Sequence, residues 1–128
     1  MPVTIGGFVP SNSFTVLSSA ARTATPNDNE YQTSGHRFLT LVTDVTAIVT
    51  APSITVSVLG VDRTSGKTYS ILVGVAITAV GTQVLKIGPG LTAAANAVAN
   101  DILPSTFRIV STHGNSNSIT YSIGAILA

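Results

Sequence analysis

Residues 54–73, ITVSVLGVDRTSGKTYSILV, decide the fold of this chain. Apolar and hydroxyl side chains alternate over Ile54–Val58, which is the period of a strand with one buried face. Tyr69–Val73 is a second run of strand-forming residues. Between the two runs, Asp62–Lys67 supplies the Asp, Ser and Gly that turns favour. This stretch therefore predicts a β-hairpin and an all-β fold.

Strand-forming runs continue on both sides of this hairpin. Arg37–Thr50 places Leu, Val and Ala at alternate positions, and Thr82–Ile87 is a further short run. Thr106–Ser111 and Ser118–Leu127 follow, and the polar segment His113–Asn117 between them predicts a second hairpin. About six or seven short strands separated by turns predict a single antiparallel β-sandwich, either a jelly roll or immunoglobulin-like.

Alternation within each run predicts which side chains face the core, since successive residues of a strand point to opposite faces. We expect these core residues: Leu39, Leu41, Val45, Ile54, Val56, Val58, Ile71, Val84, Ile109, Tyr121 and Ile123.

The chain divides into two unequal parts. Residues 1–35 contain Gly6-Gly7, three prolines and the polar run Asn27–Glu30, which predicts an extended N-terminal arm. Residues 36–128 hold the strands of the predicted sandwich. Within them, Leu91–Asn100 is rich in Ala and predicts a connecting segment, either a short helical turn or a loop.

Charged side chains are scarce, which bears on the class of protein. Asp, Glu, Lys and Arg make up 9% of the residues, against about 25% in an ordinary soluble domain. A face of the molecule is therefore expected to meet a partner or another copy rather than bulk water. The six basic residues are scattered and the net charge is +1, so we expect no contact with nucleic acid.

The N-terminus and the apolar stretches argue against export and membrane insertion. Residues 1–5 lack the basic and apolar regions of a signal peptide, and the stretch Thr68–Leu85 is broken by Gly and hydroxyl residues. A spanning helix needs about 20 mostly apolar residues. We therefore expect synthesis inside the cell and no membrane span.

No motif of the sequence indicates catalysis. Cysteine is absent, and His36 and His113 have no carboxylate at metal-ligand spacing. The five carboxylates are spread along the chain, and neither a G-x-S-x-G elbow nor a phosphate-binding loop occurs. We expect no enzyme activity, no cofactor and no metal. A hydrolase whose acid and base meet only in space ranks last among the alternatives.

Several blocks of sequence carry a resemblance to a known family. They are Ile54–Val56, Gly60–Tyr69, Ala76–Thr82, Lys86–Gly90, Asp101–Arg108, Thr112–Gly114 and Ser118–Gly124. In this order they resemble the small virion proteins of tailed bacteriophages, head decoration or minor capsid proteins, over residues 36–128. Phe107 stands where many members of that family have Trp.

The resemblance implies a structural role in the virion. We expect a capsid decoration, or cement, protein that is made in the host bacterial cytoplasm, binds the major capsid protein on the outside of a phage head and stabilises the shell. Its copies are expected to form a homo-oligomer, with a trimer favoured. The predicted capsid and subunit contacts are Ile5, Phe8, Val9, Phe14, Val16, Leu17, Arg37 and Arg108.

A second virion role stays open. An all-β sandwich with polar loops is also compatible with a tail or head-fibre component that binds host surface glycans. Against this alternative, the chain has no Trp and three Tyr, so few rings are available to stack on a sugar.

Overall fold

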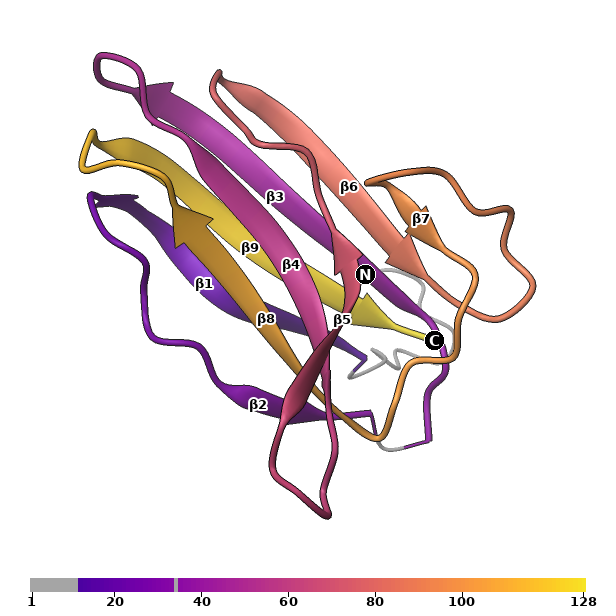
Figure 1. The fold of residues 1–128 in the computed structure, drawn as a ribbon. Helices are drawn as coiled ribbons and strands as arrows, with labels where there is room; N and C mark the ends of the chain where they lie inside the picture. Colours follow the sequence, from indigo (N-terminus) through magenta and orange to yellow (C-terminus); the bar gives the residue numbers. More distant parts are fainter. Residues whose placement is uncertain (1–11, 34) are drawn as a thin grey trace, which may run out of the picture.

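A computed structural model describes residues 12–33 and 35–128 of the chain. These residues form two β-sheets packed face to face (Figure 1). The prediction of an all-β sandwich is confirmed. The described residues contain no helix, and so none that could cross a membrane.

The larger sheet has five strands and the smaller has four. In spatial order, the five-stranded sheet consists of β1 (Ser13–Arg22), β9 (Ile119–Leu127), β3 (Leu39–Ile48), β6 (Gly81–Ile87) and β7 (Val98–Ala99). The four-stranded sheet consists of β2 (Glu30–Gln32), β8 (Thr106–His113), β4 (Ile54–Val61) and β5 (Thr68–Val73). All pairs are antiparallel except β6 with β7.

The strands pair in a nested order. β1 bonds to β9, β2 to β8, β3 to β6, and β4 to β5. Consecutive strands β1 and β2 lie in different sheets, whereas the first two strands of an immunoglobulin domain share one. Apart from the two-residue β7, eight strands in this order make a jelly roll, which decides between the two sandwich types that the sequence allowed.

The core lies between the sheets and follows the predicted alternation at most positions. The confirmed core residues are Leu39, Leu41, Val45, Ile54, Val56, Val58, Ile109, Tyr121 and Ile123. Ile71 is only partly buried, beside the buried Leu72. The prediction that Val84 faces the core is wrong, because its side chain lies on the outer face while Leu85 and Ile87 are buried in the core. Both parities of this run carry apolar side chains, so alternation alone could not choose between them.

The expected boundary at residue 35, between an N-terminal arm and the sandwich, does not match the fold. Residues 13–32 contribute β1 and β2 to the two sheets, so the sandwich begins before residue 36. The physical reason is burial: Phe14 packs against the core, and the Tyr31 ring lies between Phe14 and Phe107 at centroid distances of 5.1 and 5.7 Å.

The prediction of a hairpin loop at His113–Asn117, between β8 and β9, is also wrong. β8 and β9 belong to different sheets, so this segment crosses from one sheet to the other. Both Asn115 and Asn117 donate side-chain hydrogen bonds to the Ala51 carbonyl, and Gly114 N–H bonds to the Ser53 carbonyl. These bonds fasten the crossing to the β3–β4 connection, which passes between the sheets at the same end.

The Ala-rich segment is the expected connection, and it takes the loop form. Its backbone pairs with β6: Lys86 N–H donates to Ala97 and Gly88 N–H to Ala99. β7 arises from this pairing. Within the segment, the Ala94 carbonyl accepts from the N–H groups of Ala97 and Val98, which closes a single turn that does not continue as a helix.

We predict that Phe107→Ala lowers the free energy of unfolding by about 3–5 kcal/mol, because this fully buried ring leaves a cavity beside Tyr31. Val110→Ala, on the outer side of the same strand, is expected to cost about 1 kcal/mol or less. Urea unfolding of both variants measures the difference. Equal costs would contradict the placement of Phe107 in the core.

Candidate functional site

Few charged residues lie in the strands of either sheet. β1, β3, β6 and β9 of the five-stranded sheet contain three charged residues, Arg22, Asp44 and Lys86, and β9 contains none. The other eight lie in the four-stranded sheet or in connections. Of these eight, Glu30 and Arg108 lie in strands of the four-stranded sheet and six lie in connections, so charge is scarce in the strands of both sheets.

The outer face of the five-stranded sheet is the candidate site. We use this name for the side chains that alternate with the core residues on its four long strands: Ser13, Thr15, Thr40, Val42, Asp44, Thr82, Val84, Lys86, Thr120, Ser122, Gly124 and Ile126. Small hydroxyl and apolar side chains dominate this set. Cross-strand pairs place Thr15, Gly124, Val42 and Val84 in one uncharged row across four strands.

A shallow groove crosses this face at Gly124. It has a volume of about 390 Å³ and is lined by Ser13, Phe14, Thr15, Val42, Gly124, Ala125 and Ile126. Gly124 causes the hollow, because a Cβ at this position would find no heavy atom within 4 Å. The lining contains no charged residue.

Arg22 carries a charge at the end of β1, but its guanidinium is turned back onto the chain. Nη1 donates to the Tyr121 carbonyl at 2.8 Å and Nη2 to the Ser18 carbonyl at 2.7 Å. The guanidinium carbon also lies 4.8 Å from the centre of the Tyr121 ring, a cation–π distance. On the outer face itself, Asp44 accepts a hydrogen bond from Thr82 at 3.2 Å.

A polar cluster joins the two sheets behind this face. The Tyr121 hydroxyl of β9 shares hydrogen bonds with Ser111 Oγ at 2.8 Å and His113 Nε2 at 2.9 Å, both on β8. Burial raises the pKa of Tyr121 above 10, so it is a neutral phenol at physiological pH. Burial, with a smaller contribution from the charge of Arg22, lowers the pKa of His113.

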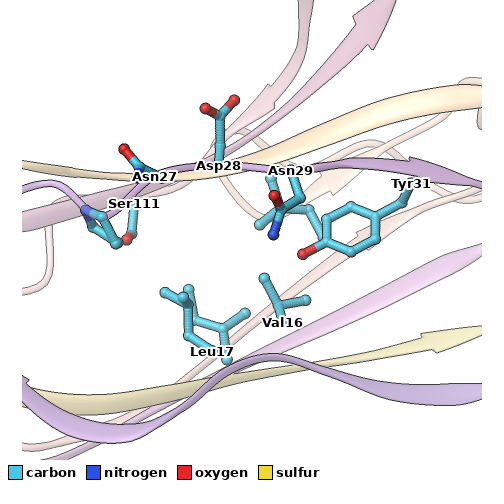
Figure 2. Close-up of a pocket in the computed structure, with 10 residues that line it drawn as sticks. Val16, Leu17, Asn27, Asp28, Asn29, Tyr31 and Ser111 are labelled. Atoms are coloured by element: carbon cyan, nitrogen blue, oxygen red, sulfur yellow. The ribbon is translucent and has the colours of Figure 1, made fainter.

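A small cavity lies beside β1, between the sheets. Figure 2 shows Val16 and Leu17 on one side and residues 27–29 on the other, with the Asp28 carboxylate turned away from the two apolar side chains. The cavity volume is about 10 Å³, which is room for about one water molecule. A small-molecule site needs about 300 Å³ or more.

The outer side of the four-stranded sheet carries an ion-pair cluster. Arg108 binds Asp28 at 3.1 Å and Glu30 at 2.8 Å, and the hydrogen bonds that it donates to these carboxylates raise the pKa of the guanidinium. A groove of about 580 Å³ beside this cluster also contains Lys67 and Leu59. The partners of this cation are thus carboxylates of its own chain.

The predicted contact residues fall into four groups. Ile5, Phe8 and Val9 lie outside the described residues. Phe14, Val16 and Leu17 are partly buried against the core of their own sandwich. Arg108 is bound within its own chain, and Arg37 is exposed, with its backbone bonded to Ala128 and Leu103. A role of these residues in capsid or subunit contact stays a prediction.

The outer face was missed as a site by sequence reasoning. Its signal was present in the positions opposite the core residues, which carry no charge in Ile119–Leu127 and one, Asp44, in Leu39–Ile48. The neighbours of these strands are remote in sequence, so the joined face becomes visible only in the fold.

The titratable groups do not converge on a reaction centre in the described parts of the chain. His36 is hydrogen bonded through Nδ1 to the Thr33 carbonyl at 2.8 Å, far along the chain from the cluster at His113. Within residues 12–33 and 35–128, no three His, Asp or Glu side chains are grouped so that they could hold a metal ion.

Comparison with known proteins gives no family. No protein-family description matches the sequence, and no curated protein is significantly similar to it.

We predict that acid weakens the fold through His113. Its pKa is lower in the folded protein than the ordinary 6.5, so below that pH the unfolded chain binds more protons. Stability should be full above pH 6.5 and fall as the pH drops below it. Urea unfolding at about pH 7.5 and about pH 5.5 measures the loss, which should be smaller in His113→Gln. The pKa of the Asp62 carboxyl is also lowered, from 3.8, so its titration affects stability only at pH values below those of this experiment.

Proposed function

We propose that this chain is a structural virion protein, a capsid decoration protein that binds the exterior of a phage head through the outer face of its five-stranded sheet. The observation that carries the proposal is the uncharged row of Thr15, Gly124, Val42 and Val84 across four strands, with the uncharged groove beside it. Its partner is the major capsid protein, and its copies associate around a symmetry axis of the shell.

The chemistry of the outer face suits a protein partner. Charged groups are depleted in the buried centre of protein interfaces, because an unpaired charge loses its hydration there at great cost. The row of Thr15, Gly124, Val42 and Val84 avoids that cost. β-Branched side chains in strands are also stiff, so little side-chain entropy is lost on binding.

The jelly-roll fold is compatible with this role, since the same architecture occurs in viral capsid proteins. That compatibility is an analogy of fold, because one architecture serves many functions. The rigid two-sheet core provides a flat surface that can repeat at every equivalent position of a shell.

The alternative, a tail or head-fibre component that binds host glycans, would use the other sheet. There the groove at Lys67 and Arg108 offers polar groups, and the neighbouring Tyr69 is 50% exposed. Saturable binding on a glycan array, lost in Tyr69→Ala, would favour this function over capsid binding.

We predict that Val84→Lys weakens binding to undecorated expanded phage heads by about tenfold or more, because the contact must then bury a charge. Val73→Lys is the matched control: Val84 is 43% exposed and Val73 is 40% exposed, but Val73 lies on the four-stranded sheet. Co-sedimentation with heads, with bound copies counted against the major capsid protein, measures both.

Two results of this experiment would reject the proposal. If the unsubstituted protein does not sediment with heads, the decoration function is wrong. If Val73→Lys weakens binding as much as Val84→Lys, the outer face of the five-stranded sheet is not the contact. Melting temperatures of both variants control for folding, since each change is at an exposed position.

A further inference from the structure

The free edge of β1 is the second feature of the five-stranded sheet that lacks a partner. Among the described residues, β1 pairs with β9 alone, so its other side is an edge of the sheet. The strand is ten residues long and has one charged residue, Arg22. Natural edge strands are usually short, or are protected by charge, proline or a covering segment.

The two halves of this edge differ. In the second half, Arg22 donates to the carbonyls of Ser18 and Ala20, at 2.7 and 3.2 Å, and the register of β1 on β9 is irregular between Leu17 and Ala20. A further strand cannot easily pair there. The first half, Ser13–Leu17, has no such side-chain bonds, and its register is regular over Ser13–Thr15, with one shift between Thr15 and Leu17.

Backbone alternation shows which groups the first half offers. Asn12 faces β9, because its carbonyl accepts from Leu127 N–H at 2.9 Å. Successive residues of an antiparallel strand bond to opposite sides, so Phe14 faces β9, while Ser13 and Thr15 direct their N–H and C=O groups away from it. These are the groups that an added strand would bond.

We infer that the edge Ser13–Leu17 binds the N-terminal segment, residues 1–11, of a neighbouring copy as an added strand. This segment has the sequence MPVTIGGFVPS. It contains no charged side chain, and Val3, Thr4, Ile5, Phe8 and Val9 are strand-forming residue types.

The sequence before β1 favours a neighbouring copy over the same chain. To pair with its own β1, the segment would have to reverse immediately before Asn12. Tight hairpins use primed turns, which need positive φ at Gly or Asn, and Pro10 cannot adopt that φ. Proline also disfavours helical backbone angles at the residue before it, which the sequence makes Val9. Gly6-Gly7 lies too far from β1 to reverse the segment onto this edge.

The length of the segment is sufficient for such an exchange. Eleven extended residues span about 36 Å at about 3.3 Å per residue, whereas the five strands of the sheet are about 19 Å apart from first to last at about 4.8 Å per strand. Because each copy gives one strand and accepts one, a closed assembly is either a reciprocal two-fold dimer or a head-to-tail ring. This inference does not depend on capsid binding.

The test is the oligomeric state of the full chain without phage heads. Native mass spectrometry and light scattering across the micromolar range should show a closed oligomer. Thr15→Pro removes the outward N–H of the edge without removing a bond to β9, and it should weaken assembly by about tenfold or more. Thr15→Val keeps the N–H and should assemble normally.

A second pair of variants tests the segment. Thr4→Pro with Ile5→Pro removes two adjacent N–H groups and should weaken assembly to the same extent, whereas Thr4→Val with Ile5→Val should not. A wild-type chain that stays monomeric would overturn the inference. An oligomer that survives both proline variants would overturn it as well, and would place the subunit contact elsewhere. An oligomer that forms but does not bind heads would reject the decoration function and leave this inference standing.

Discussion

The rest of the structure depends on the packing of two apolar sheet faces, because each strand can give only one of its faces to that packing. Ile54, Val56 and Val58 of β4 meet Tyr121 and Ile123 of β9 across the core, and all five are almost completely buried. Once the inward positions are fixed, the outward ones are free to differ between the sheets. On the four-stranded side they carry the Arg108 ion pairs, and on the five-stranded side they carry mostly Ser, Thr, Gly and Val.

Local patterns in the sequence predicted the local parts of the fold. The β4–β5 hairpin and the inward side of β3 were predictable because alternation and turn residues lie within one short stretch. Alternation failed at Val84, where apolar residues occupy both parities. It could not place β1 either: Phe14, Val16 and Leu17 read as part of an arm because the strand that completes their burial, β9, is about a hundred residues away.

The candidate site depends almost wholly on remote contacts, so little of it was predictable. The lack of charge indicated that an uncharged face exists, but its position follows from the adjacency of β1, β9, β3 and β6. Remote contacts also explain why the ion pairs of Arg108 were not predicted. Its partners Asp28 and Glu30 are 80 and 78 residues away along the chain, and no spacing rule connects them. The crossing between β8 and β9 resembled a hairpin loop because turn residues indicate a reversal, not which sheet the next strand joins.

The nested strand order has a consequence for biosynthesis. Asn12 and Leu127, which hydrogen bond to each other, are 115 residues apart, and β9 separates β1 from β3 in the sheet. During translation the β4–β5 hairpin can form early and β3 can pair with β6, but β1 has no partner, and β3 lacks its second one, until the last strand emerges from the ribosome. Until then the inward faces of both strands are exposed to solvent and to other nascent chains. Slow translation of the last strand would therefore prolong an aggregation-prone state, and a nascent chain that stalls before β9 would be a natural substrate for chaperones.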